Sequence, residues 1–412
     1  MKHRMRSVLL PRLIYFHRID FPSASGQTIQ VIRDYYAMSG RYDVHLMYRS
    51  PAAITAFELN SLLGGYHASM NTSFHMHFVQ EGVGGARRYR RFVKQLVEEG
   101  KGDGKVVLVV RTMDHAETAL SMRFASPAVN APRVLLELHE TAVPHMVYRQ
   151  DGRPLRALLS RWQERKVFSK VDGIVCTVAS QLRVLDELFP DHAPAVVLPN
   201  SVPENPNSVT GDRGLPIECT SEDRFRMRYA GQFTAWKNTD IMFAALSLLP
   251  GNFVLELAGG KMGAEHDTGE LIAKKAMQFG VAGRVQYFGF LPPVDVGSFL
   301  RQADCLLLPL GDTVQSRLFT SPMKLFEYAA SGRPMIVTRQ PTTLSLVDEN
   351  VHALMIRPGD AQDLARAAEK LAESPSVGEK IAGNASQWVR QYSASNRAIA
   401  YHEFLGEILK RR

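Results

Sequence analysis

The stretch from Ser321 to Thr338 reads SPMKLFEYAASGRPMIVT and predicts a turn, a helix and a strand, in that order. Pro322 suits the start of the helix, because an N–H group there would have no intrahelical partner. Met323 and Lys324 would then offer free backbone amides at the positive end of the helix, where a diphosphate binds well. Glu327 follows one turn later, where its carboxylate could accept two hydrogen bonds from a ribose diol. Taken alone, Glu327 could equally be an exposed helix residue.

Two strands that end in glycine are predicted upstream of this helix. The segment Tyr229–Lys237 (YAGQFTAWK) predicts a strand ending at Gly231, a turn, and a helix that begins near residue 238. Lys237 lies in the turn, where its charge would offset that of a leaving diphosphate. The segment Leu255–Gly260 (LELAGG) predicts a second strand, which ends in a flexible glycine pair that includes Gly260.

Short apolar runs recur in both halves of the chain and alternate with helical periods. In the first half they are Leu13–Phe16, Val106–Val110, Val134–Leu138, Ile174–Val178 and Val196–Leu198. In the second half they are Met227–Ala230, Phe253–Ala258, Val285–Phe288, Cys305–Leu308 and Met335–Val337. Runs that are apolar on both faces are typical of parallel strands covered by helices on both sides. The pattern predicts two doubly wound α/β domains, with ligands at a cleft between the carboxyl ends of their strands.

Residues 200–223 form the expected linker, because they hold three prolines and two glycines and show no periodicity. The helical periods after it include Ile241, Ala244, Ala245 and Leu248, and a later one for which Asp360 is the expected N-cap. We therefore expect an N-terminal domain over residues 1–205, a C-terminal domain over 224–385, and a helical segment over 386–412.

The order, spacing and wording of these motifs resemble the family 4 glycosyltransferases (glycosyl transferases group 1), which have the GT-B fold. The resemblance covers residues 225–375 well and continues more weakly through the first half. There, Ser23–Gln30 (SASGQTIQ), which contains Gly26, resembles the glycine loop that follows the family's first strand. Leu136–Glu140 (LELHE) resembles the strand that ends in the family's active-site histidine, here His139.

The resemblance implies two Rossmann-like domains that face a central cleft. The C-terminal domain would hold a nucleotide-diphospho-sugar donor, and the N-terminal domain would hold a sugar or lipid-linked sugar acceptor. Residues 386–412 would cross back to the N-terminal domain. The resemblance also implies retention of anomeric configuration, no cofactor and no metal requirement, and the chain contains no Asp-x-Asp pair to hold a metal on a diphosphate. The product would be a cell-envelope polysaccharide, an exopolysaccharide or a glycolipid.

The predicted site residues follow from these matches. The catalytic set is His139, Lys237 and Glu327, and the donor-binding set is Gly26, Gly231, Gly260, Arg317, Ser321, Pro322, Met323 and Lys324. No protein nucleophile is required, because the leaving phosphate can deprotonate the acceptor on the same face of the sugar. A lost cation or amide donor at such a site typically costs about 10²–10³ in rate.

Two positions depart from the family pattern. The family commonly has an arginine directly after the strand-end glycine, whereas Gly231 is followed here by Gln232. Arg317 is the candidate that could replace the missing cation. The family also commonly has a second glutamate eight positions before the one that matches Glu327, and Phe319 occupies that position here. Because that glutamate normally contacts the donor sugar, the identity of the sugar stays open, as does that of the base.

Two other functions remain open. A nucleotide-sugar 2-epimerase would share the two-domain arrangement, but it needs acid and base groups over the sugar, and the sequence offers no convincing set of carboxylates. A non-catalytic binding protein with a degenerate transferase fold is suggested by Gln232 and Phe319, and disfavoured by the presence of Lys237 and Glu327.

The net charge of +8 is concentrated in the first half, where residues 1–212 carry 26 basic and 20 acidic side chains. A dense cluster comprises Arg87, Arg88, Arg90, Arg91 and Lys94. It would either attract anionic lipid head groups or form a solvated helix face. No nucleic-acid-binding motif accompanies it. The amino-terminal apolar run is broken by Pro11 and Arg12, so neither a signal peptide nor a membrane span is expected. We therefore expect a cytoplasmic protein, which would contact the inner face of the plasma membrane if the basic cluster attracts lipid rather than forming a solvated face.

The cysteines and two histidines predict no metal site. Cys176, Cys219 and Cys305 lie far apart in sequence, and the first and third sit in apolar runs typical of buried residues. Such a sparse set fits a reducing cytoplasm. His75 and His77 alternate on a predicted strand, but the sequence shows no third ligand near them.

Overall fold

The computed structural model describes residues 10–23, 25–50, 52–79, 85–100, 105–124, 131–139, 141, 154–203, 224–260 and 263–410. Several positions considered above lie outside these residues: residues 1–9, Ala24, Glu140, Cys219 and most of the expected linker, 204–223. The chain forms two compact units, one of residues 1–199 together with 394–412, and one of residues 200–393.

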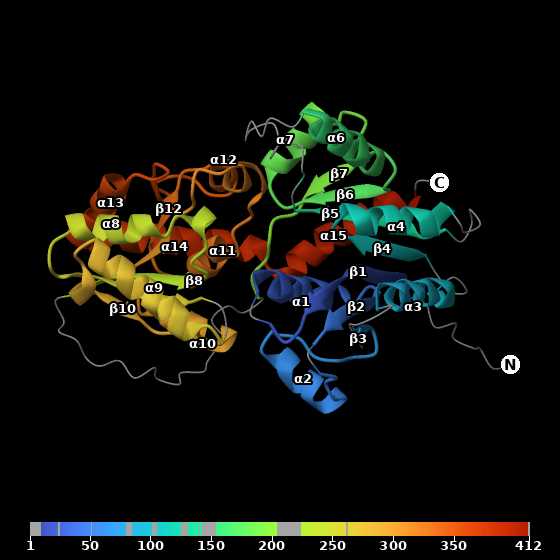
Figure 1. The fold of residues 1–412 in the computed structure, drawn as a ribbon, viewed down its shortest axis with the longest axis horizontal. Helices are drawn as coiled ribbons and strands as arrows, with labels where there is room; N and C mark the ends of the chain where they lie inside the picture. Colours follow the sequence, from blue (N-terminus) through green and yellow to red (C-terminus); the bar gives the residue numbers. More distant parts are fainter. Residues whose placement is uncertain are drawn as a thin grey trace. The chain divides into compact units, whose positions relative to one another are not determined.

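The described part of the first unit contains a seven-stranded parallel sheet in the order β3-β2-β1-β4-β5-β6-β7 (Figure 1). Its strands are β1 (Arg12–Asp20), β2 (Asp43–Arg49), β3 (Phe74–Phe78), β4 (Val106–Val110), β5 (Arg133–Leu138), β6 (Gly173–Cys176) and β7 (Ala195–Val197). Its helices are α1 (Gly26–Met38), α2 (Ala56–Gly64), α3 (Gly85–Gly100), α4 (Met113–Phe124), α6 (Pro154–Phe168), α7 (Ala179–Leu188) and α15 (Ala394–Lys410).

Helices cover both faces of this sheet, which explains why its strands are apolar on both sides. Leu13 and Tyr15 of β1 pack with α1 and α15, whereas Ile14 and Phe16 pack on the opposite face with α3 and α4. Successive side chains of a strand point to opposite faces, so both sets must be apolar.

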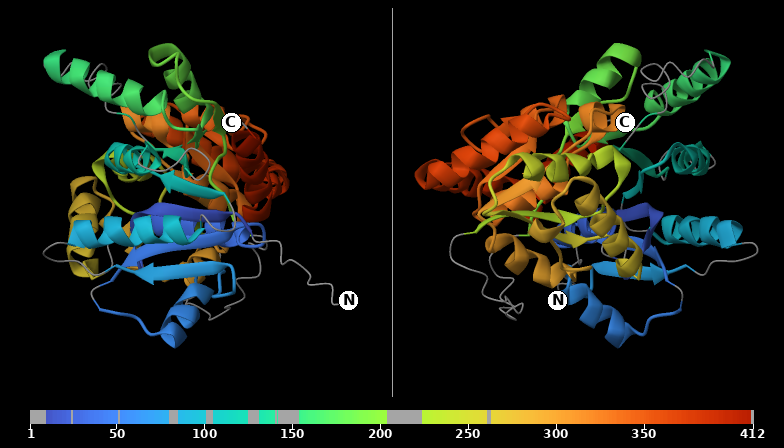
Figure 2. Two further views of the ribbon diagram at one scale, coloured as in Figure 1. Left: turned by 90° about the vertical axis from the view of Figure 1, so that its right-hand side faces the viewer. Right: turned by 60° about the vertical axis from the view of Figure 1, so that its left-hand side comes forward.

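The last helix, α15, belongs to the first unit and lies beside α1 (Figures 1 and 2). Arg397 anchors it through a buried ionic cluster. The Arg397 guanidinium lies 3.3 Å from Asp34 Oδ2 and donates to Glu137 Oε1 at 3.1 Å and to the Pro199 carbonyl oxygen at 2.9 Å. All three charged side chains are buried, so the pairing compensates charges that would otherwise be costly to desolvate.

The described part of the second unit contains a six-stranded parallel sheet in the order β10-β9-β8-β11-β12-β13. Its strands are β8 (Phe225–Gly231), β9 (Phe253–Gly259), β10 (Val285–Tyr287), β11 (Cys305–Leu308), β12 (Met335–Thr338) and β13 (Leu354–Ile356). Its helices are α8 (Asp240–Leu248), α9 (Glu265–Gln278), α10 (Pro293–Arg301), α11 (Met323–Ala330), α12 (Pro341–Leu344), α13 (Ala361–Glu373) and α14 (Pro375–Trp388). Short 3-10 helices span Ala235–Lys237, Ala282–Arg284 and Val389–Tyr392, and a short π-helix spans Gln315–Phe319.

The prediction of two doubly wound α/β sheets is confirmed. The predicted helix ends also hold in detail. Asp360 caps α13 by accepting a hydrogen bond from the Asp363 N–H at 2.9 Å, and α11 begins directly after Pro322. Cys176 and Cys305 are buried and unpaired, as their apolar surroundings predicted.

The expectation that His75 and His77 have no ligand partner nearby is wrong. Parallel pairing of β2 with β3 places His45 opposite His75, and Asp43 lies on the same face, two residues before His45. The register of two strands that lie 25 residues or more apart in the chain is not visible in the sequence itself.

None of the helices in the described parts of the chain is both long and apolar enough to cross a membrane.

Candidate active site

The start of α11 leaves backbone amides open to a ligand. Pro322 is the N-cap residue, and the helix has no side-chain cap hydrogen bond at this end among the described residues. The preceding turn is fixed by Asn200, whose backbone N–H donates to Ser321 Oγ at 3.2 Å and whose side-chain amide donates to the Ser321 carbonyl at 2.6 Å. The uncapped amides and the helix dipole together favour an anion at Met323 and Lys324.

Lys237 and Lys324 lie near this helix start, within electrostatic range of each other and of Glu327. All three side chains are half-buried. Burial lowers the pKa of Lys237 to about 7; the neighbouring ammonium of Lys324 adds to the effect, and the carboxylate of Glu327 opposes it. Burial also lowers the pKa of Lys324, again against the carboxylate of Glu327. Two partly desolvated ammonium groups that share one carboxylate are incompletely compensated, and a bound anion would complete the compensation.

Gly231 leaves the space that the Lys324 side chain occupies. A Cβ atom at Gly231 would lie 2.5 Å from Lys324 Nζ, which is closer than any real contact. The same Nζ lies 5.8 Å from the ring centroid of Tyr229, so the lysine crosses the carboxyl end of β8. The absence of a side chain at Gly231 therefore helps to set the position of the ammonium group.

Gly259 and Gly260 bring the end of β9 against the end of β8. The Gly260 N–H donates to the Gly231 carbonyl at 2.9 Å. Gly259 has a φ of +113°, and a Cβ atom there would lie 2.8 Å from the Gly231 nitrogen. Both the positive φ and the close approach require glycine at this position.

The positions that depart from the family pattern have distinct surroundings. Gln232 is exposed, and its carbonyl accepts a hydrogen bond from the Tyr229 hydroxyl at 2.8 Å. Phe319 is buried, with 3% of its surface exposed. Arg317 forms a bidentate ion pair with Asp312, at 2.5 Å from Nε to Oδ1 and 2.6 Å from Nη2 to Oδ2. Its guanidinium is thus already engaged by a carboxylate five residues earlier.

The predicted site residues of the first unit are His139 and Gly26. His139 directly follows β5, and its carbonyl accepts a hydrogen bond from Gln181 Nε2 at 3.3 Å. Its ring Nε2 is buried and has no hydrogen-bond partner among the described residues. Burial first, and the charges of Arg111 and Arg397 next, hold the pKa of His139 well below its ordinary value, so the imidazole is neutral. Gly26 is exposed and opens α1, one residue after the N-cap Ser25.

Arg111 is a residue that the sequence analysis did not single out. It directly follows β4 and is half-buried. Its charge lowers the pKa of both His139 and His17, and the pKa of His17 falls to about 4, mainly through burial. Its position at the carboxyl end of a parallel strand was the available signal, because ligand-binding groups of such sheets gather there.

The structure thus assembles the predicted residues in two sets. In the second unit it brings together Lys237, Lys324 and Glu327, with the glycines of β8 and β9 and the start of α11 close by. In the first unit it places His139 among His17 and Arg111.

Comparison with known proteins identifies a matching family and similar folds. Residues 224–374 match the family model described as glycosyl transferases group 1. The lipopolysaccharide core biosynthesis glycosyltransferase LpsE of Rhizobium meliloti is 27% identical over 181 residues, which are 42% of this chain and 48% of the relative. The D-inositol 3-phosphate glycosyltransferase of Actinosynnema mirum is 26% identical over 243 residues, which are 56% of each chain. The chain thus spans about half the length of these curated relatives.

Solved structures align over nearly the whole chain at low identity. Sucrose-phosphate synthase from Thermosynechococcus elongatus superposes with a TM-score of 0.72 at 15% identity, covering 98% of this chain and 100% of that one. HepE of Anabaena, in complex with UDP, superposes with a TM-score of 0.67 at 15% identity, covering 96% and 100%. WaaG, a glycosyltransferase involved in lipopolysaccharide biosynthesis, gives a TM-score of 0.63 at 14% identity, covering 95% and 99%.

At identities this low, the superpositions establish the fold alone. The family match rests on residues 224–374, which lie in the second unit. Residues 224–374 thus match the family of the glycosyl transferases group 1, and the two parallel sheets of the chain have the GT-B fold.

Proposed function

We propose that this protein transfers a sugar from a nucleotide-diphospho-sugar to a hydroxyl group of a sugar or lipid-linked sugar, with retention of anomeric configuration. The observation that carries the proposal is the pair of half-buried lysines, Lys237 and Lys324, beside the uncapped amides of α11. A protein gains nothing in stability from two desolvated ammonium groups in close proximity. A diphosphate supplies the negative charge that these groups lack.

Each group at this site has a proposed role in binding the donor. The ammonium groups of Lys237 and Lys324 and the amides at the start of α11 bind the phosphates and stabilise the charge that grows as the diphosphate leaves. The carboxylate of Glu327 accepts hydrogen bonds from the ribose hydroxyls. The neutral His139 has no partner at Nε2 among the residues that the structure describes, which suits it to contact an uncharged hydroxyl of the donor sugar.

The transfer step needs no nucleophile from the protein. The bond between the anomeric carbon and the diphosphate oxygen breaks, and the acceptor oxygen bonds to that carbon on the same face. The acceptor proton passes to the departing phosphate oxygen. Nucleoside diphosphate and glycoside are the two products, so atoms and charge balance without a further reactant.

The relatives support a choice of substrates to test first. HepE has been solved with UDP and with UDP-glucose, which makes UDP-sugars the first donors to test. Relatives named for lipopolysaccharide core, amylovoran and D-inositol 3-phosphate favour acceptors from envelope glycans and glycolipids. We assign the protein to the same class of pathway.

Peripheral contact with a membrane is part of the proposal. The charged side chains between the start of α3 and residue 94, all exposed, are Arg87, Arg88, Arg90, Arg91 and Lys94. The apolar residues of the same helix are buried in the first unit's core, so the basic face is left to solvent. We propose that this face meets anionic lipid at the cytoplasmic surface, where each basic residue contributes about 1 kcal/mol. Sedimentation with vesicles rich in anionic lipid, and not with neutral ones, tests this contact.

Calorimetric titration with UDP, GDP and ADP tests the donor site, followed by transfer assays with the nucleotide sugar that binds. We expect Glu327→Ala and Lys237→Ala each to lower the rate of transfer at least about 100-fold. Exposed Lys274 on α9 serves as the control through Lys274→Ala, which should leave the rate unchanged. Rates near wild type in both site variants would falsify the proposal. An epimerised nucleotide sugar formed without acceptor would instead identify a 2-epimerase.

A further inference from the structure

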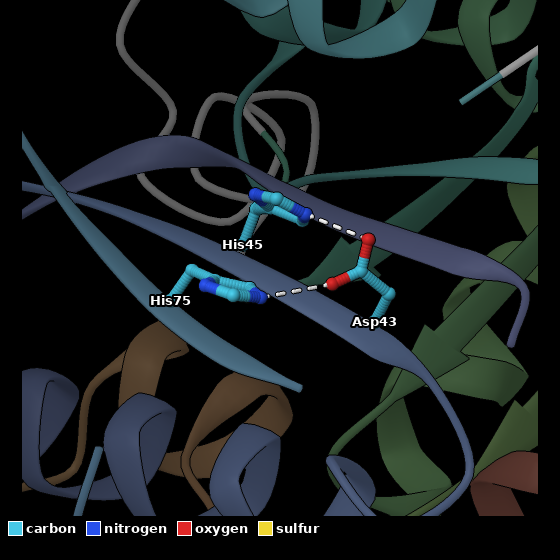
Figure 3. Close-up of side chains that lie close together, drawn as sticks. All are labelled: Asp43, His45 and His75. Carbon is cyan, nitrogen blue, oxygen red and sulfur yellow. Dashed lines mark hydrogen bonds and ion pairs between the residues drawn. The ribbon is translucent and has the colours of Figure 1, made fainter. Parts of the chain in front are cut away.

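A cluster of histidines around one carboxylate lies on β2 and β3 of the first unit. Figure 3 shows the imidazoles of His45 and His75 directed at the two oxygens of Asp43. The distances are 3.0 Å from His45 Nε2 to Asp43 Oδ2 and 3.1 Å from His75 Nε2 to Asp43 Oδ1. His77 extends the cluster, because its Nε2 lies 2.9 Å from His45 Nδ1.

The cluster lies at the amino-terminal edge of the sheet, whereas His139 follows the carboxyl end of β5. Asp43 is the first residue of β2, and His75 is the second residue of β3, which is the outermost strand on this side of the sheet. His45 is nearly enclosed, but His75 keeps 34% of its side chain exposed, so a small solute can reach the cluster from solvent.

We propose that Asp43, His45 and His75 form a binding site for a divalent cation of the zinc type. One carboxylate and two imidazoles are a ligand set that Zn²⁺ prefers, with water in a remaining position. One ligand atom from each residue lies within 4.8 Å of the others. Two bonds of about 2.1 Å to one ion span at most ~4.2 Å, so a contraction of about half an ångström is sufficient. The half-exposed His75 has the freedom to make that movement.

The hydrogen bond between His45 and His77 suits the cation-bound form. A histidine ligand usually donates its second ring N–H to a neighbour, which fixes its tautomer. His45 can bind a cation through Nε2 while its Nδ1–H donates to His77 Nε2, at the observed separation of 2.9 Å. Without a cation, the same heavy atoms are satisfied when His77 donates to His45 Nδ1 and His45 donates to Asp43. The same positions of the heavy atoms are therefore compatible with both the cation-bound and the cation-free form, which differ in the tautomers of His45 and His77.

Arg12 limits the affinity of the site. Its Nε donates to Asp43 Oδ2 at 2.8 Å, and its Nη1 donates to the Leu96 carbonyl at 2.9 Å. The guanidinium occupies one lone pair of Oδ2 and adds a positive charge close to the cation. Asp43 Oδ1 faces His75 and is free of the guanidinium contacts described here, so it is the oxygen that would bind. We therefore expect reversible binding that responds to the supply of metal.

A bound cation would join the outermost strand to its neighbour. His75 comes from β3, and both Asp43 and His45 come from β2, so the coordination bonds would add a cross-link between two strands that backbone hydrogen bonds, packing and the side-chain contacts of this cluster already join. A ligand that binds only the folded state raises its stability in proportion to the logarithm of its concentration. The effect would be on the stability of the first unit rather than on the transfer step, and it is independent of the proposed transferase activity.

Isothermal titration calorimetry of the untagged protein with ZnCl₂, after treatment with a chelator, tests the site. We expect one saturable site in the wild type, with thermal unfolding shifted upward by Zn²⁺ and unaffected by Mg²⁺, which avoids imidazole ligands. His75→Ala should weaken binding by more than about 100-fold. His77→Ala keeps all three ligands and should weaken it by about 10–100-fold.

His266 provides the control, because it pairs with a carboxylate, Glu270, at 3.2 Å on the exposed face of α9. His266→Ala should bind Zn²⁺ like the wild type. Cobalt(II) absorption in the visible range gives a second readout, and its intensity should disappear in His75→Ala. Circular dichroism in the absence of metal shows whether each variant is folded. The proposal is overturned if the wild type has no saturable site, or if a folded His75→Ala binds as tightly as the wild type.

Discussion

Replacement of Lys237 by methionine should make the free protein more stable while removing most of its transfer activity. Methionine fills a similar volume and carries no charge. The pKa of Lys237 falls from an ordinary 10.5 to about 7, through burial first and the charge of Lys324 second. The folded protein therefore disfavours the ammonium form that the unfolded chain carries freely.

The size of the gain follows from this difference in pKa. The pKa lies about 3.5 below its ordinary value, and about 1.4 kcal/mol per pH unit gives an upper limit of ~5 kcal/mol. Lys237 is half-buried, so solvent screening and relaxation reduce this limit, and we expect a gain of ~1–2 kcal/mol at pH 7. The unfavourable contribution is complete below pH 7 and declines as the pH rises, until it vanishes above about 10.5. The advantage of the variant should decline over the same range.

Urea unfolding and transfer kinetics of the same preparations measure the two effects. Lys274→Met, at an exposed position of α9, is the matched control and should change neither. In Lys237→Met we expect a higher urea midpoint and a kcat lower by about 10²–10³, because one cation at the leaving group is lost. A variant less stable than the wild type would refute the electrostatic argument, and a kcat within threefold of wild type would refute the assigned role.

Three further predictions concern the proposed donor site and the buried ionic cluster around Arg397. UDP affinity should fall by up to tenfold per pH unit above pH 7, because binding must then protonate Lys237. Calorimetry in buffers of different ionisation enthalpy should show this proton uptake on binding, and Lys237→Met should abolish it. Glu327→Gln should raise the KM for the donor more than it lowers kcat, if the carboxylate serves the ribose; equal loss in both steady-state parameters would contradict that role. Arg397→Met should lower the free energy of unfolding by ~3–5 kcal/mol, because it leaves Asp34 and Glu137 buried without their cation; a loss below 1 kcal/mol in urea unfolding would contradict this.

The sequence predicted the interior strands best. β4 and β11 match the predicted runs residue for residue, because an interior parallel strand is apolar on both faces and has sharp ends. β2 was missed because His45 interrupts its apolar run, although this histidine is buried and bonded to Asp43 and His77. β13 was missed because an edge strand of three residues carries too little pattern.

Helix orientation was less predictable than helix position. Ile241, Ala244, Ala245 and Leu248 carry the helical period that predicted α8, but Leu248 is 53% exposed and Phe243, outside that period, is fully buried. α8 is so apolar that two adjacent sides of the helix fit a 3.6-residue period of apolar residues. Packing against the sheet decides which of the two sides is buried. Sequence alone cannot supply that contact.

The donor site shows the same division between local and tertiary information. The start of α11 was predictable, because proline and the following apolar period mark it locally. The position of the Lys324 ammonium over Gly231 was not, because it depends on two strands and a helix meeting in three dimensions. The cluster of Asp43, His45 and His75 was hidden for the same reason, since strand register brings its members together.

A crystal structure of the protein with UDP tests the central claim most directly. We expect diphosphate oxygens within hydrogen-bonding distance of the backbone amides at Met323 and Lys324 and of the ammonium groups of Lys237 and Lys324, with the ribose hydroxyls on Glu327. A diphosphate that binds to other groups, with both lysine side chains directed away from it, would contradict the proposed donor site.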